Sequence, residues 1–429
     1  MEKHPRVAII RGLRTPFAKA GTAYKDLDAL DLGRIVVAEL IQRSGIDPAT
    51  VDEVIYGTVI PSVKAANIAR EIVLGTGIPP SVSSHTVTRA CASSNQAITN
   101  GADLIFRGYA NTVVAGGAES LSTVPILFSR RFADALVAAS KQKSLAGKLS
   151  VLSKIRPKDL APDAPAIAES STGLTMGESA EKMAKENGIT REEQDKFAAQ
   201  SHHRAAAAFA SGRFADEVMT VVVPPRYDEV LAKDNIIRED TTVEALGRLR
   251  PVFDRKYGTI TAGNSSPLTD GASAILLMSE DRAKALGLEP IGYLRSYAYA
   301  ALDPFDQLLQ GPAFAVPLAL DRAGIELRDV GVIEMHEAFA AQVLSNIQWL
   351  GSKEFATTRL GRSEAVGEID PEKINLTGGS IAIGHPFGAT GARIVTTVCN
   401  ELQRSGKQFG LVSVCAAGAQ GAAMVLERE

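Results

Sequence analysis

Two cysteines and one histidine lie in stretches of small residues at widely separated points of the chain. Cys91 stands in the sequence TRACASS, His385 in GHPFGATG and Cys415 in VCAAGAQG, although the chain contains only three cysteines and six histidines. A thiolate is a nucleophile, an imidazole is a base, and a second thiol is a proton donor of matched acidity. This set of groups suits the making or breaking of carbon–carbon bonds in thioesters.

Cys91 follows a run of β type and opens a helix-like stretch. Residues 85–88 form the run, and Ile98, Ala102 and Ile105 fall on one face of the predicted helix. The free N–H groups of a helix N-terminus lower a thiol pKa from about 8.5 and can also stabilise an oxyanion. We therefore expect a thiolate at Cys91. Taken alone, this residue could also be a buried structural cysteine.

His385 lies between glycines, and the following Pro386 fixes the turn. The segment lacks the Gly-Lys-Ser/Thr ending of a phosphate loop, and no G-x-G-x-x-G follows a strand, so neither a P-loop nor a dinucleotide site is predicted. Cys415 ends an apolar strand and precedes alanines and glycines, whose small side chains leave the backbone N–H groups accessible. In contrast, Cys399 lies inside a helical apolar pattern and is predicted to be a core residue.

A fourth element pairs an imidazole with a carboxylate. His336 and Glu337 follow the apolar strand predicted over 330–334. A surface-loop pair is the alternative interpretation of these two residues. Cys91, His385 and Cys415 are also metal-ligand types, but no C-x-x-C or H-x-x-x-H spacing supports a metal site, and none is predicted.

Composition excludes several classes of protein. The chain has 429 residues, of which 45% are apolar and 22% charged, and its net charge of −3 gives no case for nucleic-acid binding. No apolar run approaches the roughly 20 residues of a membrane span. Three cysteines cannot all pair, which indicates a reducing compartment. The start of the chain enters the apolar run 7–10 almost at once and the end 426–429 is no peroxisomal address, so we expect a cytoplasmic protein without a targeting peptide.

The chain repeats itself. Gly45-Ile46 and Gly324-Ile325 are each preceded by a helix-like segment, over 31–44 and 311–323, and each is followed by a short apolar strand. Later, 270–278 resembles 420–426. Helical periodicity alternating with continuous apolar runs, of which 113–117 and 410–414 are the clearest, predicts an α/β layered fold with buried, largely parallel strands.

The first half carries a long insertion, roughly 120–262. A helix is predicted over 190–210, with Thr190 as N-cap and Glu193 completing a capping box. The segment 126–160 contains eight Lys or Arg residues and only two Asp residues, so it is strongly basic. In the same segment Leu145, Leu149, Leu152 and Ile155 recur at helical spacing. Such a basic amphipathic segment can be a solvated helix, a partner-docking helix or a contact to an anionic membrane, and all three interpretations stay open.

Seven motifs share an order with those of a known family. They are Arg89–Ser94, Gly116–Ser120, Thr261–Asn264, Asp270–Ala272, His336–Phe339, Gly384–Pro386 and Cys415–Gly418. Together they resemble the motifs of thiolases and span essentially the whole chain. The family's Asn-Glu-Ala-Phe is His-Glu-Ala-Phe here. Its Cys-x-Gly-Gly-Gly is Cys-Ala-Ala-Gly-Ala over residues 415–419. Both departures, with the basic insertion, resemble the thiolase (β) subunit of bacterial trifunctional enzymes of fatty-acid oxidation.

The resemblance implies a fold and a division into domains. The fold is the α/β thiolase fold, with duplicated βαβαβαββ halves in five layers (α-β-α-β-α) and an inserted loop domain. Residues 1–119 plus 263–285 form the N-terminal half and 286–429 the C-terminal half. Residues 120–262 form the loop domain, with CoA binding and dimer or partner contacts.

The resemblance also implies an activity and its residues. The activity is CoA-dependent cleavage of 3-ketoacyl-CoA to acetyl-CoA and a shortened acyl-CoA. Cys91 is the nucleophile, His385 its base and Cys415 the acid for the acetyl-CoA enolate. One oxyanion site uses the backbone N–H groups of Cys91 and Ala417; the other uses His385 and a water held in most thiolases by the Asn that is His336 here.

Further implications concern ligands and partners. Ser266 and Met176 fall where the family's loop domain contacts pantetheine. CoA is a co-substrate, and no cofactor or metal is implied. The expected partners are a second copy of the chain and a hydratase/3-hydroxyacyl-CoA dehydrogenase subunit, with peripheral membrane contact as a further expectation.

Three other functions compete with this one. A biosynthetic acetoacetyl-CoA thiolase would not need the 126–160 segment. A non-catalytic lipid-binding or scaffold protein on this fold is disfavoured because Cys91, His385 and Cys415 are all present. A condensing β-ketoacyl synthase typically has histidine in place of the second cysteine, so Cys415 argues against it.

Overall fold

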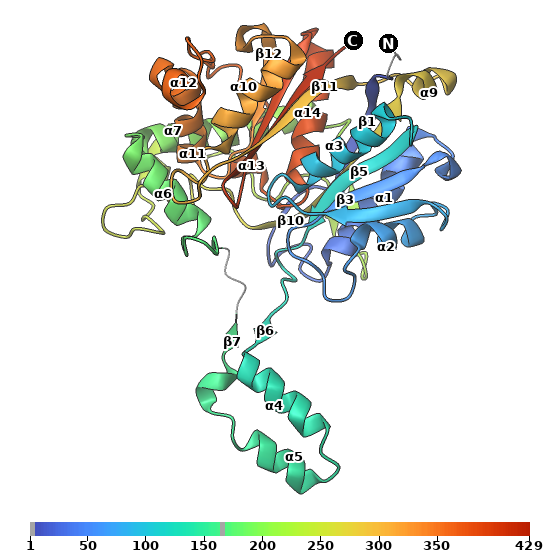
Figure 1. The fold of residues 1–429 in the computed structure, drawn as a ribbon, viewed down its shortest axis with the longest axis vertical. Coiled ribbons are helices and arrows are strands. Elements are labelled where there is room, and N and C mark those ends of the chain that lie inside the picture. Colours follow the sequence, from blue (N-terminus) through green and yellow to red (C-terminus); the bar gives the residue numbers. More distant parts are fainter. Residues whose placement is uncertain (1–4, 164–167) are drawn as a thin grey trace. The chain divides into compact units, whose positions relative to one another are not determined.

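The computed structural model describes residues 5–163 and 168–429. The described chain divides into two compact units, one comprising residues up to 123 together with 169–429 and the other residues 124–168 (Figure 1). Nine strands of the larger unit form one continuous path, and a short tenth strand, β2 (Ala18–Lys19), pairs with β10. In sheet order the path is β12 (Val330–Met335), β13 (Phe409–Ala416), β14 (Gln420–Glu427), β11 (Gly292–Ala301), β1 (Val7–Arg14), β10 (Thr269–Ser279), β5 (Thr112–Glu119), β3 (Glu53–Gly57) and β4 (Ser83–Val87).

The prediction of largely parallel strands is wrong. Parallel pairing joins β3 to β4 and to β5, and β12 to β13, whereas the other strand pairs are antiparallel. The reason is burial: every residue of the antiparallel strand β10 is buried. A strand covered on both faces shows a continuous apolar run whatever its direction, so the pattern reports burial and not orientation.

The predicted internal repeat is confirmed. Helix α1 (Ala29–Ser44) ends at Gly45 with φ 65° and leads through a short 3₁₀ turn into β3. Helix α10 (Gly311–Ala323) ends at Gly324 with φ 68° and leads through the same kind of turn into β12. Both glycines adopt the left-handed conformation that closes a helix, which is why Gly recurs at this point of the repeat.

Helices cover the sheet in layers. Helix α1 and α2 (Ile68–Gly75) pack on the strands of the first half, and α10 and α11 (Ala340–Leu350) on those of the second. Between the halves, α3 (Ser93–Phe106) and α14 (Thr390–Ser405) share one core with strands of both, and the predicted core residue Cys399 is fully buried there. The predicted α-β-α-β-α layering is thus present.

The described part of the larger unit contains six further α-helices and a short ribbon. They are α6 (Met176–Glu186), α7 (Arg191–Ala210), α8 (Val243–Gly247), α9 (Glu280–Ala285), α12 (Lys353–Arg359) and α13 (Ser380–Ile383), and a two-stranded ribbon is formed by β8 (Val221–Val222) and β9 (Val230–Leu231). Helix α7 begins after Thr190, and Thr190 and Glu193 form the predicted capping box. None of the helices in the described ranges is long and apolar enough to cross a membrane.

The smaller unit, residues 124–168, holds α4 (Arg130–Ser140), α5 (Leu145–Leu152) and the paired strands β6 (Leu127–Phe128) and β7 (Pro162–Asp163) (Figure 1). The helical spacing expected from Leu145 to Ile155 holds only to Leu152, where α5 ends. No residue of α5 is buried, and Leu145 and Leu149 are 74% and 59% exposed. Leu145 and Leu149 are therefore largely uncovered in the isolated chain, whereas Leu152 is half-buried.

Candidate active site

Four segments from both halves bring the predicted site residues together. Cys91 lies between β4 and α3, His336 directly follows β12, His385 follows α13, and Cys415 is near the end of β13. The Cys91 Sγ and one ring nitrogen from each histidine lie within 4.8 Å of one another. The two imidazole centroids are 4.0 Å apart. Groups from distant parts of the sequence thus share one small volume.

The Cys91 thiol sits in a tight turn before α3. The preceding Ala90 has φ 45°, a left-handed conformation that is strained for alanine. The backbone N–H groups of Ala417 and of Cys91 itself are directed at the thiol and favour the thiolate, but burial outweighs them and raises the pKa of Cys91 to about 12. The expectation of a lowered pKa is therefore wrong: α3 begins only at Ser93, and the desolvation of the thiol exceeds the effect of the helix end.

Cys415 is nearly inaccessible and lies beside Cys91. Its side chain is 1% exposed, and burial, followed by the nearby Cys91, raises its pKa well above the usual range. The chain turns back immediately afterwards, with Gly418 at φ 79° and Ala419 at φ 54°. The Gly418 N–H donates to Glu169 Oε2 at 2.8 Å. A neutral thiol is thus held where it can give a proton to a group bound at Cys91.

His385 is held as a neutral base. Its backbone N–H donates to Thr269 Oγ1 at 2.6 Å, and its Nδ1 lies 2.6 Å from Thr390 Oγ1. Burial, with a further contribution from Arg393, lowers the pKa of His385 to about 3. Its Nε2 is buried without a hydrogen-bond partner among the described residues. An uncharged imidazole nitrogen is therefore free for the thiol proton.

Glu119 is a residue whose role the sequence did not reveal. It is buried at the end of β5, where Oε2 accepts from Val59 N at 2.9 Å and from Gly388 N at 3.1 Å. Burial raises the pKa of Glu119 to about 7 despite these bonds. The carboxyl group ties the loop that carries His385 to the first half of the molecule. The signal available in the sequence was a glutamate at the end of the otherwise mostly apolar run 112–118.

His336 and Glu337 have separate surroundings. The His336 ring is fully buried, with Nδ1 2.9 Å from Ser380 Oγ and with an Nε2 that has no partner among the described residues. Glu337 is also fully buried and accepts from Ser201 Oγ at 2.7 Å and Asn375 Nδ2 at 2.6 Å. The alternative of an exposed loop pair is therefore wrong. Glu337 anchors surrounding loops, whereas His336 belongs to the cluster around Cys91.

The two predicted CoA-contact residues border the same region. Met176 is half-buried at the start of α6 and packs on a core cluster that includes Phe339 and Cys415. The Ser266 N–H donates to the carbonyl of Ala338 at 2.9 Å, so Ser266 lies next to the His336 segment. Both positions are compatible with a substrate that extends outward from the cysteines.

The ligand atoms of Cys91, His336 and His385 are also of types that zinc accepts. Sequence spacing did not reveal this grouping, because the three residues come from separate loops. The backbone N–H of Ala417 is directed at the thiol. A backbone donor in this place is a feature of an oxyanion site and not of a zinc site. The arrangement thus offers a nucleophile with polarising groups, which is what acyl transfer through cysteine requires.

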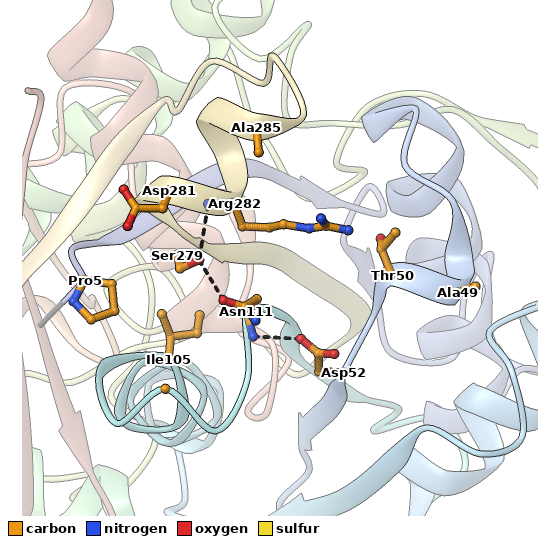
Figure 2. Close-up of a pocket in the computed structure, with 11 residues that line it drawn as sticks. Pro5, Ala49, Thr50, Asp52, Ile105, Asn111, Ser279, Asp281, Arg282 and Ala285 are labelled. Carbon is orange, nitrogen blue, oxygen red and sulfur yellow. Dashed lines mark hydrogen bonds between the residues drawn. The ribbon is translucent and has the colours of Figure 1, made fainter.

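A separate surface pocket of about 580 Å³ is lined by residues that include the start of α9 and the segments before β3 and β5 (Figure 2). In it, Asp52 Oδ2 accepts the N–H of Asn111 at 2.7 Å. These two residues precede the parallel strands β3 and β5, whereas Cys91 follows the carboxyl end of β4, which runs parallel to β3. Ligands of α/β sheets bind at the carboxyl ends of parallel strands, so the pocket in Figure 2 is not the site of the predicted chemistry.

Comparisons with known proteins agree with this arrangement. Residues 7–281 match the N-terminal domain of thiolases and residues 288–428 match the C-terminal domain. The chain is 54% identical over 424 residues to proteins named 3-ketoacyl-CoA thiolase from Yersinia pestis and Yersinia pseudotuberculosis, covering 99% of this chain and 97% of each relative.

Solved structures give the same result. The crystal structure of the Bacillus anthracis acetyl-CoA acetyltransferase superimposes with a TM-score of 0.87 at 33% identity, covering all of both chains. Human mitochondrial 3-ketoacyl-CoA thiolase superimposes with a TM-score of 0.83 at 32% identity over 99% of both chains. The chain belongs to the thiolase family and has the thiolase fold.

Proposed function

We propose that this protein is a 3-ketoacyl-CoA thiolase, an acyltransferase of fatty-acid β-oxidation that acts in the cytoplasm. The main support is that the Cys91 Sγ and a ring nitrogen each of His336 and His385 lie within 4.8 Å of one another, with the Cys415 thiol beside Cys91. Support for this substrate class comes from the full-length identity of 54% to proteins named 3-ketoacyl-CoA thiolase. CoA serves as the second substrate.

In the first half-reaction, His385 Nε2 takes the Cys91 proton and the thiolate attacks the 3-keto carbon. The bond between C2 and C3 breaks, the acyl group stays on Cys91 as a thioester, and the electron pair leaves on C2 as the acetyl-CoA enolate. Cys415 protonates C2. The unpartnered Nε2 of His385 and the buried, neutral Cys415 thiol support these two roles in the described part of the chain.

In the second half-reaction, the Cys415 thiolate takes the proton of an incoming CoA, either directly or through His385 once the imidazolium has passed its own proton on. The CoA sulfur attacks the thioester, the bond from Cys91 to the acyl carbon breaks, and the shortened acyl-CoA is released. The Cys91 thiolate then regains its proton from His385. The N–H groups of Cys91 and Ala417 stabilise the thioester oxyanion, and His385 with His336 polarises the keto oxygen. Met176 and Ser266 contact pantetheine.

Thiolysis assays with 3-ketoacyl-CoA from C4 to C16 test this proposal. We expect CoA-dependent release of acetyl-CoA across long chains, and its loss in Cys91→Ser. Turnover confined to C4 would favour the biosynthetic acetoacetyl-CoA thiolase, and absence of turnover at every length would refute both.

We further propose that the chain is the β subunit of a trifunctional assembly that also contains a second copy of itself. Residues 120–262 would act as the loop domain, and 124–168 would dock a hydratase/3-hydroxyacyl-CoA dehydrogenase subunit. Support comes from charge: Asp134 and Asp159 pair with Arg130, Arg131 and Arg156. The lysines of this segment form no ion pair with any described residue, and the uncovered apolar side chains of α5 lie among them.

The docking proposal is tested with Lys141, Lys143 and Lys148 changed together to Glu, against the same three changed to Arg. Pull-down of the hydratase/dehydrogenase subunit should fail with the Glu variant and persist with Arg, with the difference greatest at low salt. Thiolysis of short substrates should be retained by both. If the two variants differ in flotation with anionic vesicles but not in pull-down, the segment binds a membrane. If they differ in neither assay, the segment is a solvated helix.

A further inference from the structure

A chain of buried polar groups leads from Arg393 to the unpartnered nitrogen of His336. Arg393 lies in α14 with 1% exposure, and its Nη2 donates to Ser380 Oγ at 3.2 Å. Ser380 Oγ in turn lies 2.9 Å from His336 Nδ1. All three side chains are fully or almost fully buried. Which group donates in each of these two hydrogen bonds can be deduced from the number of hydrogens that each side chain carries.

A guanidinium group has donors only and keeps its charge in proteins, so Ser380 Oγ accepts from Arg393. The serine hydroxyl has a single hydrogen, and its other partner among the described residues is His336 Nδ1. If Nδ1 carried a proton, it would donate to the same oxygen and leave the hydroxyl hydrogen buried without an acceptor. Leaving a buried donor without an acceptor costs its desolvation energy, so the opposite direction is preferred.

We propose that Ser380 is a positioning residue that fixes the tautomer of His336, so that Nδ1 accepts from the serine and Nε2–H donates into the active site. This inference rests on the proposed thiolase function. It explains how His336 can serve as a donor at this position, because an imidazole presents a fixed N–H only when its tautomer is set.

The surroundings of His336 support a neutral ring with a donor at Nε2. Burial, then the neighbouring His385 and Arg393, lowers the pKa of His336 well below its usual range, so the ring carries one proton. We place that proton on Nε2, which has no hydrogen-bond partner in the described part of the chain and is free to donate to a bound substrate. A lone pair there would instead face His385 and a developing oxyanion and would repel the latter.

The direct test is ¹⁵N NMR of the histidine-labelled protein, with the His336 signals assigned by their loss in His336→Asn. We expect a pyridine-like Nδ1 and a pyrrole-like Nε2 for His336. A pyrrole-like Nδ1 would overturn the inference. This readout does not depend on turnover, so a protein without thiolase activity would refute the proposed function and leave the tautomer result to stand on its own.

A matched pair of variants tests the consequence for catalysis. Ser380→Asn and Ser380→Asp have the same size, but an Asn amide can donate to His336 Nδ1 while accepting from Arg393, whereas an Asp carboxylate only accepts. We expect the Asp variant to show protonated Nδ1 and a kcat at least about tenfold below that of the Asn variant, with a smaller change in KM. Equal kcat values and equal spectra in the two variants would assign Ser380 a purely structural role.

Discussion

The imidazole rings of His336 and His385 lie with their centroids 4.0 Å apart and their planes inclined by 44°, and each has a buried Nε2 without a hydrogen-bond partner among the described residues. Buried polar atoms are normally paired, so two unpaired nitrogens next to a thiol indicate that a bound substrate supplies their partners. Burial lowers the pKa of both rings. Two neutral imidazoles can lie this close, whereas two imidazolium ions would repel each other.

The charge state of Cys91 gives a first prediction, about pH. Burial raises the pKa of Cys91 to about 12 and lowers that of His385 to about 3, so the free enzyme holds a neutral thiol beside a neutral imidazole. Because only the thiolate is alkylated, the rate of Cys91 modification by iodoacetamide should rise about tenfold per pH unit across the neutral and mildly alkaline range. Mass spectrometry of the Cys91 peptide measures the rate. A rate that is already constant at neutral pH would instead reveal a preformed thiolate–imidazolium pair.

The second prediction concerns the covalent intermediate. Incubating the protein with 3-ketoacyl-CoA and no CoA should leave an acyl group on Cys91, because no second thiol can remove it. Cys91→Ala should lose both the adduct and thiolysis. Intact-mass and peptide mass spectrometry locate the acyl group. Its appearance on Cys415 or Cys399 would reverse the assignment of the nucleophile.

The sequence was sufficient to predict which elements recur, and it singled out cysteines and histidines that the fold brings close together. The helix after Thr190 and the helices that end before Gly45 and Gly324 were predicted, and they follow local rules of capping and helix termination. The grouping of Cys91 with His385 was predicted from residue types and motif order, and no local rule places them together. The division into domains and the catalytic roles stay predictions.

Strand direction and the electrostatics of the site could not be predicted from the sequence. Burial of β10 on both faces gives the same apolar run for either direction of the strand. The pKa of Cys91 depends on how much water the fold removes, and the helix that suggested a thiolate begins only at Ser93. The bond from Ser380 to His336 joins residues 44 positions apart, and no sequence spacing indicates it.

A third prediction concerns the stability of the loop behind the site. A Cβ on Gly379 would lie 2.1 Å from Glu337 Cδ, and that carboxylate is already held by Ser201 and Asn375. Gly379→Ala should therefore destabilise the protein by about 1–3 kcal/mol, the usual cost of overpacking a buried site. Thermal unfolding measures the effect.

The matched control is Gly247→Ala. Gly247 is the last residue of α8, is exposed, and a Cβ added to it would have no heavy atom of the described residues within 4 Å. This substitution should leave the melting temperature unchanged or slightly raised, since Ala favours helix more than Gly. Equal melting temperatures for the two variants would show that the Glu337 cluster tolerates a methyl group.

The fourth prediction separates the two active-site cysteines. Cys415 is 1% exposed beside Cys91, and its buried thiol is the proton donor proposed for the acetyl-CoA enolate. Cys415→Ser keeps the size of the side chain but replaces the thiol by a far weaker acid, so exchange of the acetyl-CoA α-proton with deuterated solvent should fall by roughly 10²–10⁴-fold. Formation of the acyl adduct on Cys91 from preformed acyl-CoA should change much less, because that transfer requires no carbanion. Proton exchange is followed by NMR and acylation by mass spectrometry. A variant with normal exchange would remove Cys415 from the mechanism, and an equal loss in both assays would mean that the substitution disturbs Cys91 itself.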